Sequence, residues 1–216
     1  MEKATGTPFA AVGTASVADA LAEHDLTGVI EGPQFVVGSG MFLGRAVTVQ
    51  LDAAGQAGPE DSRRIWDVVD NAAAGSVLVV STRGAEISAL GGVIAGTAAA
   101  RDFAGAVTDG LIRDADEIAS HGFPVHCRRA HPRAIWGCCT GTEIPVRFGD
   151  VEVAAGDLIV ADRDGVVCVP KGIVTDVMER AYRIEKLERL WVDHARAYRS
   201  IAKGFEAVTD QYGSPH

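Results

Sequence analysis

The stretch Gly105–Asp114, G-A-V-T-D-G-L-I-R-D, runs from a short apolar segment through a polar turn to an adjacent arginine and aspartate. The apolar segment predicts a buried strand, and the T-D-G that follows predicts the turn that ends it. At a strand exit, Arg113 can hold a carboxylate at two points with its planar guanidinium. Asp114 offers a hard oxygen ligand for Mg2+ or Mn2+. The stretch therefore predicts a place where an anionic oxo acid is held against a divalent metal.

The same pair has a purely structural alternative. Asp114 precedes the helix-compatible run 115–120 and can serve as its N-cap, and Arg113 can form a salt bridge within the loop. Adjacent arginine and aspartate residues are common in proteins. The pair by itself therefore favours neither alternative.

Helix and strand signals alternate along the first half of the chain. Apolar residues at helical spacing predict helices, and alternating or continuous apolar runs predict strands. The predicted helices cover 16–23, 59–74 and 91–103, and the predicted strands cover 46–51, 76–81 and 104–107. The last strand–helix–strand unit ends at the Arg-Asp pair, and its crossover should be right-handed. This alternation predicts an α/β fold.

After Pro124 the pattern changes to hairpins, of which Asp164-Gly165 is the strongest signal. Short strands are predicted over 144–148, 151–153, 158–161 and 166–169, followed by a helical region that extends to about Lys203. No repeat or low-complexity linker divides the chain. We therefore expect a single domain over 1–216, with its core at about 16–170 and a C-terminal helical extension at about 171–216.

The composition suits an enzyme with many tight turns. Among 216 residues, 47% are apolar, 6% are aromatic and 25 are glycines, which argues against a coiled coil or a disordered chain. The net charge of −9 and the lack of a basic run argue against nucleic-acid binding. No apolar segment approaches the roughly 18 residues of a membrane span, and the N-terminus lacks the pattern of a signal peptide. We expect a cytoplasmic protein with neither a membrane nor a nucleic-acid partner.

The four cysteines are then expected to be free thiols, because the cytoplasm is reducing. A zinc site built from Cys127, His131, Cys138 and Cys139 is the alternative. Adjacent cysteines in a strand point to opposite faces and form no C-x-x-C knuckle. The intervening Arg128, Arg129, Pro132 and Arg133 are cationic or stiff, which is a poor setting for a zinc–thiolate site. The sequence disfavours a zinc role.

Three separated motifs resemble the RraA-like superfamily, which includes 4-hydroxy-4-methyl-2-oxoglutarate and 4-carboxy-4-hydroxy-2-oxoadipate aldolases. They are the run from A-L-G-G-V-I-A-G at 89–96 to the Arg-Asp pair, the hairpin region Gly149–Pro170, and the closing G-F-E-A-V-T-D-Q-Y-G at 204–213. The resemblance extends from about Ser16 to the C-terminus. It implies a swivelling β/β/α fold, an α/β/α sandwich, with a C-terminal helical extension.

The resemblance also implies roles for individual residues. The family's substrate arginine falls on Arg113, and its aspartate ligand for Mg2+ or Mn2+ falls on Asp114. Asp109 is implied as a group that orders metal-bound water. The family's carboxylate-binding turn, whose backbone N–H groups face an anion at a helix N-terminus, falls on Gly91, Gly92, Val93 and Ile94. Taken alone, these glycines favour a plain tight turn.

The family's sites form between subunits, which implies a homo-oligomer, either a trimer or a hexamer. An acidic residue of the neighbour's C-terminal helix approaches the metal waters, and Glu185 or Glu188 could supply it, although a solvated helix face is the favoured alternative for each. The apolar Leu187, Leu190 and Trp191, together with the low charge of the helix predicted from Gly91, also suggest surface for a partner. The alternative is ordinary packing on the chain's own core.

One position departs from the family pattern. Many members carry an aspartate twenty-one residues before the arginine, where this chain has Gly92. A carboxylate that orders metal-bound water is therefore missing, and Gly92→Asp is expected to raise the rate if the turn tolerates a Cβ atom. A second departure follows the strand that ends at Ser81, where family members often have an acidic residue and this chain has Arg83. Its positive charge could favour a more anionic substrate; the alternative is an exposed loop arginine.

The activity implied by the resemblance is that of a metal-dependent lyase. It would cleave a 4-hydroxy-2-oxo acid to pyruvate by retro-aldol chemistry, and the same pyruvate enolate arises when oxaloacetate is decarboxylated. Two alternatives stay open: a non-catalytic regulator of a ribonuclease, and a different lyase or hydrolase acting on a sugar-derived acid. A quinone methyltransferase is not supported, because no glycine-rich nucleotide fingerprint follows a first strand.

Overall fold

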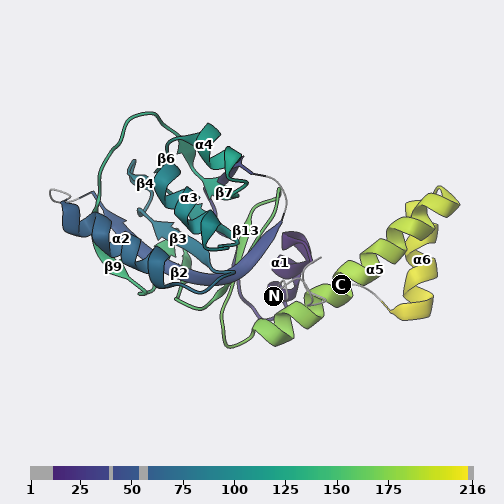
Figure 1. Cartoon of the computed structure of the whole chain (residues 1–216). Helices are drawn as coiled ribbons and strands as arrows, with labels where there is room; N and C mark the ends of the chain where they lie inside the picture. The colour runs from purple at the N-terminus through teal and green to yellow at the C-terminus, as the bar shows by residue number, and fades with distance from the viewer. Residues whose placement is uncertain (1–11, 39–40, 54–57, 214–216) are drawn as a thin grey trace.

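The computed structural model describes residues 12–38, 41–53 and 58–213 (Figure 1). Its central sheet has the order β1-β7-β5-β3-β2-β12-β13, with β9 paired to β2. The strands of this sheet are β1 (Gln34–Val37), β2 (Phe42–Asp52), β3 (Val77–Ser81), β5 (Gly105–Thr108), β7 (Val125–Cys127), β9 (Cys138–Thr142), β12 (Leu158–Ala161) and β13 (Val166–Val169). The neighbours β2, β3, β5 and β7 run parallel, and β12 and β13 extend the sheet in antiparallel fashion.

The buried strand β3 shows why the sheet is covered on both faces. All five of its residues are buried, as expected for a parallel strand between two layers. Leu78 and Val80 pack against α2 (Pro59–Asn71), α3 (Gly92–Ala100) and α4 (Ala115–Ser120). The alternate residues Val77 and Val79 pack against the hairpin of β10 (Val146–Phe148) and β11 (Val151–Val153). The layers are therefore helix, sheet and hairpin, which confirms the β/β/α fold.

A second helical layer covers the antiparallel end of the sheet. Helix α1 (Thr14–Ala22) and the start of α5 (Val174–Tyr198) enclose a separate apolar cluster with β12 and β13. The carboxylate of Asp162 fixes α1 there, since it accepts hydrogen bonds from the amide and hydroxyl of Thr14 at 2.8 and 2.7 Å. In this region one face of the sheet is covered by α1 and α5, and the other face packs on the β10–β11 hairpin.

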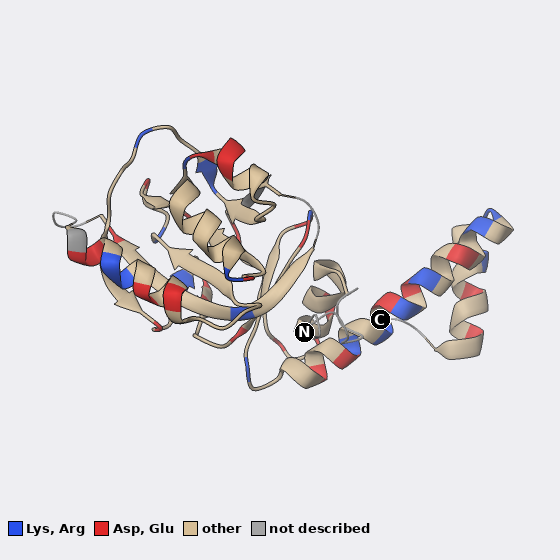
Figure 2. Cartoon of the chain, viewed as in Figure 1, with Lys and Arg blue, Asp and Glu red and all other residues tan. Residues whose placement is uncertain are grey.

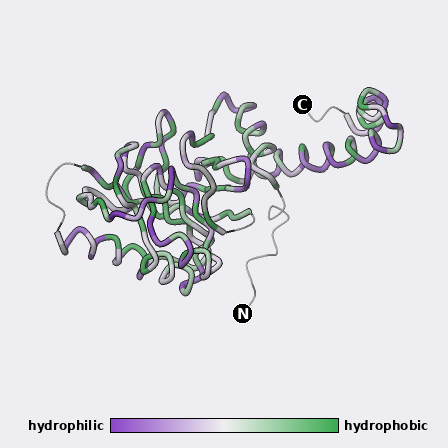
Figure 3. The backbone as a smooth tube through the Cα atoms, turned by 90° about the horizontal axis from the view of Figure 1, so that it is seen from above, coloured by the Kyte–Doolittle hydropathy of each residue, from purple (hydrophilic) through white to green (hydrophobic). Residues whose placement is uncertain are grey.

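The C-terminal extension forms two helices, although the sequence predicts one helical region ending near Lys203. Helix α5 ends at Arg199, which has a left-handed φ of 49°, and α6 (Ile201–Tyr212) folds back along it. The two helices form an arm that projects from the body in both views (Figures 1 and 3). Positions of both basic and acidic residues are distributed along the arm, as the colours of Figure 2 show.

The apolar residues of α5 serve contacts within the chain. Leu187 is buried, and the Trp191 and Phe205 rings meet edge-on with 4.9 Å between centroids. For Leu187 and Trp191 the structure thus shows the alternative, packing within the chain, while Leu190 is half-buried and a partner surface on α5 stays a prediction. No helix in the described ranges is long and apolar enough to cross a membrane.

The close packing of α6 on α5 depends on Gly204. A Cβ atom there would lie 2.5 Å from the backbone nitrogen of Ala195. We expect Gly204→Val to undock α6, because backbone atoms cannot move aside as a flexible side chain can. Amide hydrogen exchange over 201–212 should become at least about tenfold faster, with little change in the sheet. Ala202→Val, at an exposed position of the same helix, is the matched control; equal protection in both variants would contradict this packing.

Candidate active site

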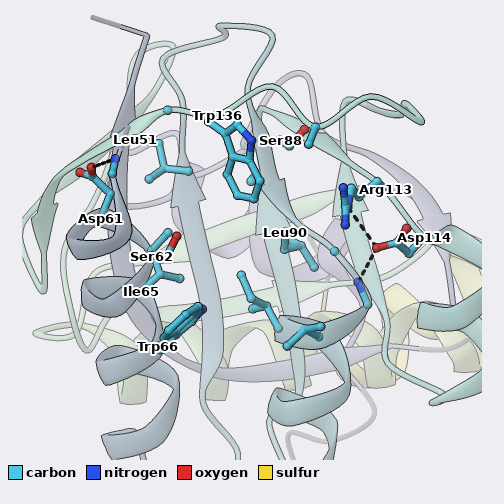
Figure 4. A pocket seen from close by; sticks show the side chains of 18 residues that line it. Leu51, Asp61, Ser62, Ile65, Trp66, Ser88, Leu90, Arg113, Asp114 and Trp136 are labelled. Atoms are coloured by element: carbon cyan, nitrogen blue, oxygen red, sulfur yellow. Dashed lines mark hydrogen bonds and ion pairs between the residues drawn. The ribbon is translucent and has the colours of Figure 1, made fainter. Parts of the chain in front are cut away.

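A cavity of about 430 Å³ opens between the N-terminal ends of α2 and α3 (Figure 4). Its volume lies in the range of small-molecule sites. It is lined by Leu51, Gly58, Asp61, Ser62, Ile65, Trp66, Ser88, Ala89, Leu90, Gly91, Gly92, Val93, Ile94, Arg113, Asp114, Ala134, Trp136 and Gly137. The Arg-Asp pair and the glycine turn, two motifs far apart in the sequence, thus meet at one cavity.

A small parallel sheet brings these motifs together. Strand β6 (Leu111–Ile112) lies between β4 (Ser88–Leu90) and β8 (Arg129–Ala130), and Ile112 pairs with Leu90. The Arg113 amide also donates to the Leu90 carbonyl at 3.2 Å. Because β4 leads into Gly91 and β6 leads into Arg113, their carboxyl ends place both motifs side by side.

The Asp114 carboxylate caps a different helix from the one expected. Asp114 occupies the N-cap position of α4 but makes no side-chain cap bond there. Its Oδ2 instead accepts hydrogen bonds from the Gly92 amide of α3 at 3.1 Å and from Arg113 Nε at 3.2 Å. Of the two parts of the structural alternative, the salt bridge within the loop is confirmed. The N-cap hydrogen bond to the helix at 115–120 is not, because the carboxylate bonds to α3 instead. Its backbone is left-handed, with φ 61° and ψ 39°, a conformation that aspartate adopts more readily than most residues.

The first turn of α3 lines the same end of the cavity as Arg113 and Asp114. The leading amides of a helix have no carbonyl partner within it and carry partial positive charge. The Gly92 amide donates to Asp114, so a role for the turn in binding a substrate carboxylate, which stays a prediction, would fall to the amides of Val93 and Ile94. Gly91 is required for this closeness, since a Cβ atom there would lie 2.9 Å from Asp114 Oδ2.

The space beside Gly92 is filled by Glu117, a residue that the sequence analysis missed. A Cβ atom at Gly92 would lie 2.2 Å from Glu117 Oε2, so the glutamate of α4 reaches the position where a longer side chain at 92 would begin. Its other oxygen lies 3.9 Å from His121 Nε2. The sequence did hold one indication of this role. Glu117 comes three residues after Asp114 in a segment predicted to be helical, and residues at that spacing have their side chains on the same side of a helix.

Two other predicted residues lie outside the cavity lining. Asp109 holds the loop after β3, because its oxygens accept hydrogen bonds from the Thr82 amide at 2.6 Å and the Gly84 amide at 2.7 Å. Arg83 lies on the same loop with its side chain 68% exposed, 3.5 Å from Asp52. The structure therefore does not bring either residue to Arg113 and Asp114.

The predicted acidic residues of the C-terminal helix lie on α5, away from the cavity of their own chain (Figure 1). Glu185 Oε2 accepts a hydrogen bond from the Ser16 hydroxyl at 2.8 Å, and its Oε1 pairs with Arg189 at 3.1 Å. Glu185 therefore helps to hold α1 on α5. A contact of Glu185 or Glu188 with a neighbouring subunit remains a prediction.

The wall opposite Arg113 was not expected from the sequence. Asp61, Ile65 and Trp66 face the cavity from α2, and Trp136 reaches it from the segment before β9 (Figure 4). The amides of Gly58 and Cys139 each donate to Asp61 at 2.7 Å and hold the pKa of this carboxyl below its ordinary value. The Pro59-Glu-Asp helix start predicted a helix here but not a cavity wall.

Asp114 offers a single carboxylate to a divalent metal, and a hydrated Mg2+ or Mn2+ there stays a prediction. Magnesium commonly binds through one or two carboxylates, with waters and substrate oxygens completing its shell. Within the described ranges no group of three or more His, Cys, Asp or Glu residues is arranged to hold a metal by itself. Zinc would need thiolates, but burial raises the pKa of the Cys127 thiol to about 12 and also raises that of Cys139.

Comparisons with known proteins point to one family. The model of the RraA-like family, described as Aldolase/RraA, matches residues 14–168. A protein of Halalkalibacterium halodurans named "Putative 4-hydroxy-4-methyl-2-oxoglutarate aldolase" is 31% identical over 200 residues, which cover 90% of this chain and 91% of the relative. A protein of the same name from Ectopseudomonas mendocina is 33% identical over 138 residues, 63% of this chain and 81% of the relative.

Solved structures agree with the family and with the fold. The structure of RraAS2 from Streptomyces coelicolor, described as an unusual member of the RNase ES inhibitor RraA protein family, matches with a TM-score of 0.75 and 28% identity. That match covers 84% of this chain and 93% of the other. An uncharacterized protein from Pseudomonas syringae matches with a TM-score of 0.83 at 25% identity, over 93% and 92% of the two chains. The chain belongs to the RraA-like family of aldolases and RraA proteins.

Proposed function

We propose that this protein is a lyase that cleaves a 4-hydroxy-2-oxo acid to pyruvate with the help of Mg2+ or Mn2+. The observation that carries the proposal is the Arg113–Asp114 pair held against the first turn of α3 at one end of a ligand-sized cavity. The names of the curated relatives support the same reaction class. Oxaloacetate decarboxylation belongs to the proposal, because it passes through the same enolate.

The 2-oxo acid binds with its carboxylate between Arg113 and the Val93 and Ile94 amides. The guanidinium donates through its paired N–H groups, and the helix amides add partial positive charge without needing to reorganise. Arg113 Nε is held by Asp114, which fixes the direction of the guanidinium. This grip orients the bond between C3 and C4 relative to the carboxylate.

Asp114 is the residue that would hold the divalent metal, which when bound supplies a Lewis acid for the 2-oxo oxygen. In the reaction the C4 hydroxyl loses its proton, its C–O bond becomes a carbonyl, and the C3–C4 bond breaks. The electron pair of that bond forms the pyruvate enolate, and protonation at C3 gives pyruvate. The positive charge of Arg113 stabilises the developing negative charge. Glu117, beside Gly92, is the carboxylate that we propose to order the water that takes the C4 proton.

A regulatory role is the second candidate, favoured by the likeness to Streptomyces coelicolor RraAS2. A regulator acting by protein–protein contact needs neither a carboxylate aimed at α3 nor a cavity behind it. We favour the lyase because this chain has both.

Replacing the pair should remove activity. We expect Asp114→Asn to abolish metal-dependent pyruvate release and to weaken Mn2+ binding, measured by electron paramagnetic resonance. Arg113→Lys should lower kcat/KM by about 100-fold, because an ammonium cannot reproduce a two-point grip. Asp116→Asn and Arg101→Lys, at exposed positions on α4 and after α3, are matched controls. If wild-type protein binds Mn2+ but releases no pyruvate from any 4-hydroxy-2-oxo acid or oxaloacetate, the lyase proposal fails.

The missing carboxylate at Gly92 gives a second prediction. The space that its side chain would need is taken by Glu117, so Gly92→Asp alone should displace the flexible glutamate and change the rate less than about threefold. Glu117→Ala should lower kcat by about 10- to 100-fold, and Gly92→Asp with Glu117→Ala should recover most of that loss. Wild-type kcat in Glu117→Ala would show that Glu117 orders no reacting water; Asp116→Ala is the control.

Assembly into a homo-oligomer, a trimer or a hexamer, is also proposed. Val93 on α3 is 80% exposed despite being apolar, which suits a surface covered by another copy. We expect light scattering to give a mass three or six times the 22.6 kDa of one chain. A monomer at micromolar concentration would contradict a site shared between subunits.

A further inference from the structure

The cavity has two ends of different chemistry, as Figure 4 shows. Arg113 and Asp114 form one end, next to the first turn of α3. Away from them the wall is apolar and aromatic, and it is made by Leu51, Ile65, Trp66, Leu90 and Trp136. A molecule gripped by its carboxylate at the polar end therefore extends its other end along this wall.

The two tryptophans of the wall are unusually exposed for their size. Trp66 is 50% exposed and Trp136 is 68% exposed, whereas aromatic side chains of this size are normally well covered. They come from separate segments, α2 and the stretch before β9, and both line the same cavity. A ligand with an apolar or aromatic group would cover surface that the fold leaves in water.

The charges of the cavity argue against a second carboxylate on the ligand. Among the lining residues within the described ranges, Arg113 is the only lysine or arginine. Arg83 and Arg129 form ion pairs with Asp52 and Glu86, and neither lines the cavity. The far wall instead carries the carboxylate of Asp61. Arg64 lies near Asp61 but does not line the cavity, and its guanidinium donates to the Cys139 carbonyl at 2.7 Å. A distal carboxylate would therefore find no lysine or arginine among the residues of this wall, and it would lie close to the negative charge of Asp61.

We propose that the substrate is a 2-oxo acid whose C4 substituent is uncharged and apolar or aromatic, bound along Trp66 and Trp136. The proposal rests on the lyase function proposed above and narrows it: oxaloacetate, which carries a second carboxylate, becomes a poor substrate. The preferred substrate class is a monoanion such as a 4-aryl- or 4-alkyl-4-hydroxy-2-oxobutanoate. Retro-aldol cleavage of the phenyl compound breaks C3–C4, turns the C4 hydroxyl into the aldehyde of benzaldehyde, and releases pyruvate.

Binding of two analogues without the C4 hydroxyl tests the selectivity apart from turnover. Both would be titrated by calorimetry into the full-length protein with Mn2+: 2-oxo-4-phenylbutanoate, with an aromatic end, and 2-oxoglutarate, with a second carboxylate. We expect the phenyl compound to bind at least about tenfold more tightly. Equal or tighter binding of 2-oxoglutarate, or no binding of either compound, overturns the proposal.

Variants of the wall locate the effect. Trp136→Ala and Trp66→Ala should each reduce the preference for the phenyl analogue by about 10-fold while leaving the affinity for 2-oxoglutarate within about threefold. Trp191→Ala, between α5 and α6 and away from the cavity, is the matched control and should keep the wild-type preference. An unchanged preference in both wall variants, with both proteins folded by circular dichroism, also overturns the proposal.

Turnover separates this proposal from the lyase function on which it rests. Pyruvate release would be measured from 4-hydroxy-2-oxo-4-phenylbutanoate and from 4-hydroxy-4-methyl-2-oxoglutarate. Tight binding of the phenyl analogue without pyruvate from either compound would reject the lyase and keep the selectivity. Higher kcat/KM for the dicarboxylate, with tighter binding of 2-oxoglutarate, would keep the lyase and reject the selectivity.

Discussion

The site depends on one short contact, in which the Asp114 carboxylate meets the Gly92 amide at the start of α3. The contact exists because β4 and β6 run parallel and end together, and because Gly91 has no side chain to hold them apart. It places negative charge at a helix N-terminus, where it is favoured, and draws the Arg113 guanidinium to the same place. This one carboxylate thus joins the glycine turn, the Arg-Asp pair and the start of α4 at one end of the cavity.

Much of the fold could be predicted from local patterns. The continuous apolar run at 76–81 predicted a buried strand, and β3 is that strand, because a strand buried on both faces needs apolar residues throughout. Asp164-Gly165 predicted a hairpin, and it connects the antiparallel pair β12 and β13. The break between α5 and α6 was not predicted. It occurs at Arg199, whose backbone is left-handed, and arginine is not a residue type that indicates this conformation in a sequence. For Leu187 and Trp191 the sequence left two alternatives open, a partner surface or packing within the chain. Apolar residues along a helix do not by themselves indicate which surface they contact, and only the structure shows packing within the chain for these two.

The candidate site could be predicted only where its residues are close in sequence or lie in a motif. Arg113, Asp114 and the glycine turn were found in this way and do line one cavity. Asp109 instead accepts hydrogen bonds from the amides of Thr82 and Gly84 in the loop after β3 and does not line the cavity. Trp136 and Glu117 were missed because their roles depend on tertiary contacts: one reaches the cavity from an irregular segment, and the other fills space left by a glycine on a different helix.

The origin of the cavity walls has a consequence for how this protein can diversify. The glycine turn and the Arg-Asp pair follow β4 and β6, whereas the opposite wall comes from α2 and the segment before β9. The two walls therefore rest on separate parts of the backbone. Substitutions in one wall can alter the shape of the cavity while the residues of the other wall stay as they are, and one fold can in this way come to accommodate different ligands.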